Sequence, residues 1–423
     1  MDRKVYNSYV DLLRRELVPA LGCTEPIAIA FAAAKAREVL GCEPEKIVMH
    51  CSGNIIKNVQ GVTVPTSGGL RGIAVAAILG AVGGDASKNL EALTGINDAH
   101  RARMRELLDQ KICTCELAEN VDNLYILAEL SAGDQTAAVE VSGSHTNITR
   151  IERNGEVLFR AETKNVKDTA DKSLLKFRDI LEFAETVDLD DVRDVLKRQI
   201  EYNEAISDEG LRGRYGVNVG RELMDRYDSS DVRIRARARA AAGSDARMGG
   251  CSMPVVINSG SGNQGMTVSL PVIEYARDMK ASEDRLYRAL VVANLTSLLQ
   301  KRYIGDLSAF CGATSAAAGA TAGIAWLKGF DEAAIERTIT NTIASIGGMV
   351  CDGAKASCAY KIALALEAAI LGMELGGEDG RSFAPGEGLV QDDIEKTIAN
   401  VGRMGRDGMK STDVEILKIM IGQ

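Results

Sequence analysis

The sequence has few aromatic residues, few histidines and no long apolar run. Aromatic side chains make up 4% of the 423 residues and only one is tryptophan, so a stacking surface for nucleic-acid bases is not expected. Three histidines are too few for a histidine-rich metal site. The longest apolar stretches, at 72–84 and 311–326, are short or rich in Gly and Ala. Neither resembles a membrane-spanning helix.

Basic residues are also fewer than acidic ones, and the net charge is −9. This charge argues against nucleic acid or an anionic membrane as a partner. The alternation of Arg with Ile or Ala at 233–239 therefore favours an ion-paired helix over a nucleic-acid patch. No signal-peptide segment precedes the first helical pattern, so we expect a cytoplasmic protein. In that compartment nine cysteines are not expected to form a disulfide framework.

The pattern of apolar residues divides the chain into two parts and predicts an α+β fold. An N-terminal mixed α/β domain is expected at 1–172, with strands at 124–130 and 136–141 and a hairpin at 149–160. A mostly α-helical catalytic domain is expected at 173–423, where helical spacing predominates. The charged segment Lys164–Lys172 is the predicted boundary.

Three cysteines in the C-terminal third are candidate metal ligands. Cys311 opens a Gly/Ala/Ser-rich helix start, and Cys351 and Cys358 bracket a short loop before another helix. Free N–H groups at helix starts stabilise thiolates and anionic clusters. Their spacing alone also fits ordinary buried thiols. Cys113 and Cys115 are interpreted as ordinary, partly buried thiols.

The turn Gly22-Cys23-Thr24-Glu25-Pro26 is a second candidate site. Pro26 at a first helical position, with Thr24 near the N-cap, predicts a helix start. Cys23 would then lie beside the helix N-terminus, where its pKa is expected to fall. A purely structural cysteine is the alternative.

Two polar, Gly-rich loops are candidate binding sites for a small anion or a carboxylate. The loop Gly260–Gly265 also matches the G-x-G-x-x-G string of dinucleotide sites, but its helical surroundings do not favour a Rossmann domain. The other loop lies in the first domain, and His145 is a candidate proton-transfer group. The candidate substrate-binding residues are Asn54, Lys57, Asn58, Thr66, Ser67, Gly68, Ser261, Asn263 and Gln264.

Together these stretches resemble the L-cysteine desulfidase family, which is related to the iron–sulfur L-serine dehydratases. Segment 22–28 is similar to the signature of the desulfidase branch. Segment 258–265 resembles the substrate loop of the serine dehydratase α domain. Segments 311–323 and 349–361 resemble its first cluster-cysteine helix and its paired-cysteine loop, although the pair is more closely spaced here.

The resemblance implies a 4Fe-4S cluster held by Cys311, Cys351 and Cys358, and L-cysteine as the substrate. β-Elimination would give pyruvate, ammonia and hydrogen sulfide. Cys23 is the implied catalytic residue, because it can cap the open iron and then take the Cα proton. No cysteine follows Cys358, so no fourth ligand is expected from the C-terminus.

Three alternatives remain open at this point. The same site could serve an L-serine dehydratase. A pyridoxal-phosphate β-lyase would use Lys355 or Lys361 as its Schiff base and the loop at 260–265 for the phosphate. A non-catalytic redox sensor would also carry a cluster, but the sequence shows no DNA-binding helix pair or basic face. A homodimer is one of the open oligomeric states.

Overall fold

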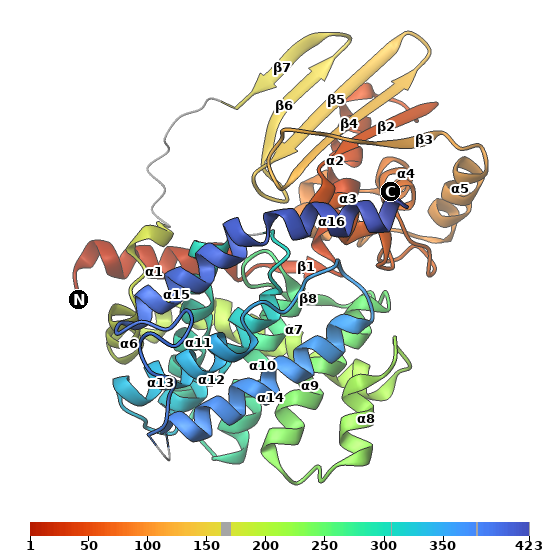
Figure 1. Cartoon of the computed structure of the whole chain (residues 1–423). Coiled ribbons are helices and arrows are strands. Elements are labelled where there is room, and N and C mark those ends of the chain that lie inside the picture. Colours follow the sequence, from red (N-terminus) through yellow and green to blue (C-terminus); the bar gives the residue numbers. More distant parts are fainter. Residues whose placement is uncertain (162–170, 306, 378–379, 423) are drawn as a thin grey trace.

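A computed structural model describes residues 1–161, 171–305, 307–377 and 380–422. It combines one six-stranded mixed sheet from the N-terminal half with a large assembly of helices, so the predicted α+β class is confirmed (Figure 1). No helix in these ranges is both long and apolar enough to cross a membrane.

The sheet occupies one end of the molecule. Its strand order is β3-β2-β4-β5-β6-β7, and only the β2–β3 pair is parallel. The predicted hairpin forms β6 and β7, with Asn154 and Gly155 at positive φ in its turn. The elements of this part are α1 (Arg3–Glu16), β1 (Pro19–Leu21), α2 (Thr24–Leu40), β2 (Lys46–Cys51), α3 (Gly53–Gln60), α4 (Ile73–Gly83), α5 (Asp98–Asp109), β3 (Cys113–Leu117), β4 (Tyr125–Ala132), β5 (Gln135–Ser142), β6 (Ile148–Arg153) and β7 (Glu156–Arg160).

In its described residues the second half is helical apart from one short strand, as its apolar spacing predicts. Helices α10, α11 and α12 are buried along most of their length and form the centre of this part. The elements are α6 (Phe177–Thr186), α7 (Arg193–Arg212), α8 (Val219–Arg226), α9 (Val232–Met248), β8 (Pro254–Val256), α10 (Gly262–Asp278), α11 (Glu283–Ile304), α12 (Gly312–Leu327), α13 (Glu332–Ile346), α14 (Ser357–Gly377), α15 (Ile394–Arg403) and α16 (Lys410–Ile421).

The two halves exchange segments. The N-terminal helix α1 packs on the helical half, where Tyr9 meets the ring of Phe183 edge-on with 5.4 Å between centroids. Strand β1 pairs with β8. At the other end of the chain α16 lies against α3 (Figure 1). The predicted boundary at residue 172 stays a prediction, and most of the charged segment 164–172 lies outside the described residues.

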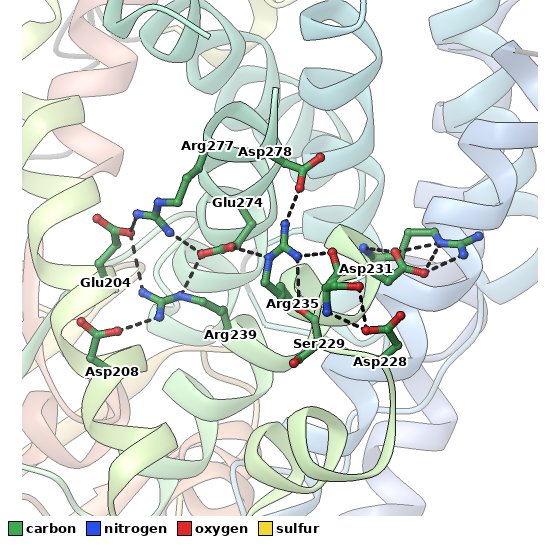
Figure 2. A network of polar contacts seen from close by, with 12 residues as sticks. Glu204, Asp208, Asp228, Ser229, Asp231, Arg235, Arg239, Glu274, Arg277 and Asp278 are labelled. Atoms are coloured by element: carbon green, nitrogen blue, oxygen red, sulfur yellow. Dashed lines mark hydrogen bonds and ion pairs between the residues drawn. The ribbon is translucent and has the colours of Figure 1, made fainter. Parts of the chain in front are cut away.

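The Arg-rich segment 233–239 forms ion pairs, as its composition predicts. It lies on α9, and Figure 2 shows its arginines between carboxylates of neighbouring helices. At the centre is Glu274 of α10, whose side chain is only 4% exposed and contacts the Nε atoms of Arg235 at 3.4 Å and Arg239 at 3.2 Å. Arg277 also pairs with Glu274. The network ties α9 to α10.

We expect Glu274→Ala to lower the free energy of unfolding by about 3–5 kcal/mol, because it leaves arginine charges without their buried partner. The matched control is Asp208→Ala, which removes a half-exposed partner of Arg239. The control should cost about 1 kcal/mol or less. Urea unfolding of both variants measures the difference. Equal losses would show that Glu274 is not the centre of the network.

Candidate functional site

A cavity of about 100 Å³ lies where the two halves meet. Its walls come from the start of α2, from α3, from the β5–β6 turn and from five segments of the helical half. Four of the nine cysteines face it. The polar and cysteine residues of its lining are Cys23, Glu25, Asn58, His145, Arg247, Ser259, Ser261, Asn263, Gln264, Lys301, Ser308, Cys311, Cys351 and Cys358.

Cys311 and Cys351 are placed by a short backbone pairing between segments 40 residues apart. The N–H of Cys311 donates to the carbonyl of Met349 at 2.8 Å, and the N–H of Cys351 donates to that of Ala309 at 2.6 Å. Phe310 and Val350 form the antiparallel bridge between these bonds. The two thiols are thereby brought into hydrogen-bond contact.

Each of the three predicted cluster cysteines faces a backbone N–H group. Cys311 is the N-cap of α12 and makes no capping hydrogen bond, but the nearby N–H of Ala313 acts to lower the pKa of its thiol. Cys351 accepts from Gly353. Cys358, in the first turn of α14, accepts from the N–H of Lys355 at 3.5 Å. Such N–H groups stabilise thiolates and the sulfurs of iron–sulfur clusters, so these residues fit the implied cofactor.

Positive charge surrounds the same loop. The pKa of Cys351 is lowered, first because the thiol of Cys311 donates to it and also because the ammonium groups of Lys57 and Lys361 are near. Burial raises the pKa of Cys358. A thiolate at Cys351 is therefore the form that this environment favours.

The cysteines do not form a site for a single ion. Among the residues that the structure describes, no group of three or more His, Cys, Asp or Glu side chains converges as a mononuclear metal site would require. A cubane cluster takes one thiolate for each iron, so its ligands surround a larger object.

Cys23 enters the cavity from a tight turn. It is the N-cap of α2 and its side chain makes no capping hydrogen bond. Gly22 before it has φ 60°, and a Cβ there would lie 2.1 Å from Cγ of Pro65, so only glycine fits. Cys23 is 2% exposed and packs in a small apolar cluster that includes Cys358. Because Cys23 and Cys358 are far apart in the sequence, their proximity could not be predicted from it.

The expectation of a lowered pKa at Cys23 is wrong for this structure. Burial raises it first, and the carboxylate of Glu25 raises it further. The thiol donates to Oε2 of Glu25 at 3.1 Å, while Asn58 donates to Oε1 at 3.1 Å. The helix N-terminus does not compensate for the loss of water around the sulfur. Cys23 is therefore a neutral thiol hydrogen-bonded to a carboxylate.

The loop at 258–265 is a turn followed by a helix start. Ser259 and Gly260 have positive φ, and Ser261 caps α10 by accepting from the N–H of Gln264. The strand before it, β8, pairs only with β1 among the described strands, and that pairing is antiparallel. A Rossmann βαβ unit is therefore absent at this place in the described chain. The start of α10, where helix N–H groups lack intrahelical acceptors, lines the cavity through Ser261, Asn263 and Gln264.

Only some of the predicted substrate-binding residues line the cavity. Asn58, Ser261, Asn263 and Gln264 line it, and so does the candidate base His145, which lies against Gly260. The others are not in its lining: two lie on α3 and three in the turn at 66–68. These residues are Asn54, Lys57, Thr66, Ser67 and Gly68.

Three of the chain's lysines near the cluster cysteines are engaged in ion pairs. Lys57 is 1% exposed, pairs with Asp413 of α16 and donates to the carbonyl of Cys351 at 3.4 Å. Lys355 and Lys361 both pair with Asp352. A Schiff base requires a free, neutral amine. These ion pairs therefore do not favour the pyridoxal-phosphate alternative.

Sequence reasoning did not single out Glu25, Arg247 or Lys301. Glu25 sits in the quoted turn, and its place beside Cys23 in the first helical turn was the available signal. Arg247 follows a run of arginines that pair on the protein surface, so the pattern could not set it apart. Lys301 lies in the last turn of α11, where basic residues are common, so its type and position did not set it apart.

Asp245, two residues before the cavity-lining Arg247 on α9, makes folding stability depend on pH. Its side chain is fully buried, and burial raises its pKa to about 7 despite hydrogen bonds from the N–H groups of Gly220 and Val219. Between pH 4 and 7 the unfolded chain loses this proton while the folded chain keeps it. Stability therefore falls as the pH rises, by about 2–4 kcal/mol in total.

We expect Asp245→Asn to remove this dependence, because the amide cannot ionise and is nearly isosteric. The stability of the variant relative to the natural chain should increase from pH 4 to 7 and then stay constant. Urea unfolding midpoints at one-unit pH intervals measure this. A difference that does not change with pH would contradict the assignment.

Comparison with known proteins gives extensive similarity. The family model of the serine dehydratase alpha chain matches residues 87–418. A UPF0597 protein of Lachnoclostridium phytofermentans is 50% identical, covering 99% of this chain and 100% of its own length. UPF0597 proteins of Desulfitobacterium hafniense and Finegoldia magna are 48% and 49% identical. They cover 99% and 98% of this chain, and 98% and 99% of their own lengths.

Proposed function

Because the chain belongs to the serine dehydratase alpha chain family, we propose that it is an iron–sulfur L-cysteine desulfidase. Family membership supports the coarser statement, a lyase of the dehydratase type. The finer proposal is a carbon–sulfur lyase that converts L-cysteine and water to pyruvate, ammonia and hydrogen sulfide. A reducing cytoplasm is the compartment in which its thiols would persist.

One observation carries the proposal. Cys311, Cys351 and Cys358 line the same cavity as Cys23, although Cys23 lies almost 300 residues away in the sequence. Three of the thiols face backbone N–H groups and would hold the cluster. The fourth packs beside Cys358 and is hydrogen-bonded to a carboxylate. Three ligands leave one iron for a substrate, as in metal centres with an open position.

The residues can move the necessary proton. When bound, the cluster supplies a Lewis-acidic iron, which is a soft partner for a departing sulfur. Cys23, with Glu25 at 3.1 Å as an acceptor for its proton, is placed to become the thiolate that takes hydrogen from Cα. The Cα–H electron pair then forms the double bond, and the Cβ–S bond breaks to release sulfide.

Anaerobic cluster reconstitution followed by assays on L-cysteine and L-serine tests the proposal. Iron and acid-labile sulfide should rise together, and sulfide and pyruvate should form in equal amounts from L-cysteine. A larger kcat/KM for L-serine would make the chain an L-serine dehydratase. Full activity of metal-free protein supplied with pyridoxal phosphate would refute cluster chemistry.

A further inference from the structure

A buried arginine forms one wall of the cavity. Arg247 is 2% exposed, and its Nε donates to the carbonyl of Gly22 at 2.8 Å. A Cβ on Gly262 would lie 2.4 Å from Nε of Arg247, so the guanidinium packs against the first residue of α10. The positive end of a helix and a buried cation therefore meet at one place.

This cation has no carboxylate partner within ion-pair distance in the described part of the chain. Other arginines of α9, such as Arg235 and Arg239, do pair with carboxylates, but they lie nearer the start of the helix than Arg247. Glu25 lines the same cavity but is engaged by Cys23 and Asn58. A buried guanidinium is costly without an anion, so the arrangement suits an anion that enters the cavity. The planar fork of arginine matches a carboxylate.

The same cavity is lined by residues with acceptors that lack donors. Oε1 of Gln264 and Oδ1 of Asn263 are buried and find no hydrogen-bond donor among the described residues. Gln264 is 7% exposed, and its amide packs against Gly312, the residue after Cys311. Buried acceptors are normally satisfied, and an ammonium group carries three donors.

We propose that Arg247 and the first turn of α10 bind the carboxylate of an α-amino acid, and that Gln264 and Asn263 accept from its ammonium group. With both ends held at this wall, the β-substituent is directed along the side of Gly312 toward the cysteines. The site therefore selects amino acids that have a free carboxylate. The identity of the amino acid rests on the proposed function, whereas the zwitterion site rests on these four groups.

Direct binding to the full chain, without its cluster, tests the site. Titration calorimetry compares L-alanine, which has both charged groups, with ethylamine, which lacks the carboxylate. Arg247→Met should weaken L-alanine binding about 100-fold and leave ethylamine unchanged, because only the carboxylate loses its partner. The control is Arg37→Met, which removes an arginine that donates to the Gly84 carbonyl outside the cavity. It should bind both ligands normally.

A merely structural arginine would behave differently. If Arg247 only holds the Gly22 turn, L-alanine and ethylamine should weaken in parallel, and this result would overturn the proposal. No L-alanine binding by the natural chain, with or without a cluster, would also overturn it. If Arg247→Met does not fold, Arg247→Lys replaces it, with a selective loss of about 10-fold expected since one charge but not the fork remains.

Sulfide release from L-cysteine is measured on reconstituted samples of the same preparations. One result would refute the zwitterion site but not the proposed function: the natural chain turns over L-cysteine, and Arg247→Met leaves the ratio of L-alanine to ethylamine affinity unchanged. The opposite result would refute the proposed function but not the zwitterion site: Arg247→Met loses L-alanine binding selectively, and the natural chain releases no sulfide from L-cysteine.

Discussion

Cys23→Ala is expected to lower the turnover of L-cysteine at least about 100-fold, the lower range for loss of a general base. The cluster should still assemble, because the backbone contacts of Cys311, Cys351 and Cys358 do not involve Cys23. It should be more labile in air, because the open iron loses the thiol that caps it before substrate binds. Anaerobic iron content, sulfide release and the rate of bleaching in air are the measurements.

Substrate binding should survive in this variant. The thiol of L-cysteine can approach the site without competition, so a spectral change with no sulfide production is expected. Cys251→Ala is the matched control, because Cys251 is also buried but does not line the cavity. Normal turnover by Cys23→Ala would make Cys23 structural. His145, in the same cavity, would then be the next base to test.

Glu25 refines the interpretation of Cys23. A buried thiol with a raised pKa is a poor base as it stands, because it holds its own proton. The carboxylate at 3.1 Å can receive that proton, and Asn58 holds the other carboxylate oxygen in place. The functional unit is therefore a thiol–carboxylate pair, which the local sequence places two residues apart.

The strongest local patterns were predictable from the sequence. The helix starts at Cys311 and before Cys358, and the hairpin turn at Asn154-Gly155, depend on Gly, Ser and Asn chemistry within a few residues. The Arg-rich helix formed ion pairs as its composition indicated. Such features follow from neighbours in the chain, so no tertiary information is needed.

Other features depend on contacts between distant segments. The part of the predicted first-domain loop that holds Asn54 and Asn58 is instead the short helix α3. Its Lys57 and Gly53 contact α16 from the far end of the chain. Helices this short are stabilised mainly by packing. The lowered pKa predicted for Cys23 used the helix dipole but not burial, which dominates. Arg247 could be distinguished from its neighbours only by its place at the cavity.

Replacing Cys351 with serine is expected to abolish both cluster assembly and turnover. Cys351 has the favoured thiolate, is pinned by its N–H to Ala309, and accepts from Cys311 and Gly353. A serine hydroxyl is a hard, protonated ligand that iron–sulfur clusters bind poorly, although it fills nearly the same space. Iron analysis and visible absorption after anaerobic reconstitution measure assembly, and circular dichroism measures the fold.

The same result is expected for Cys311→Ser and Cys358→Ser, with Cys251→Ser as the control that keeps full iron and activity. The decisive result is that all three Cys→Ser variants lose the cluster to the same extent. A cubane that loses any one of three ligands is left with two, whereas a merely positioning cysteine would give a graded loss. Since Cys351 is fixed by backbone hydrogen bonds that do not use its side chain, the fold should remain after substitution. A Cys351→Ser protein with full iron and full activity would therefore show that Cys351 is not a cluster ligand.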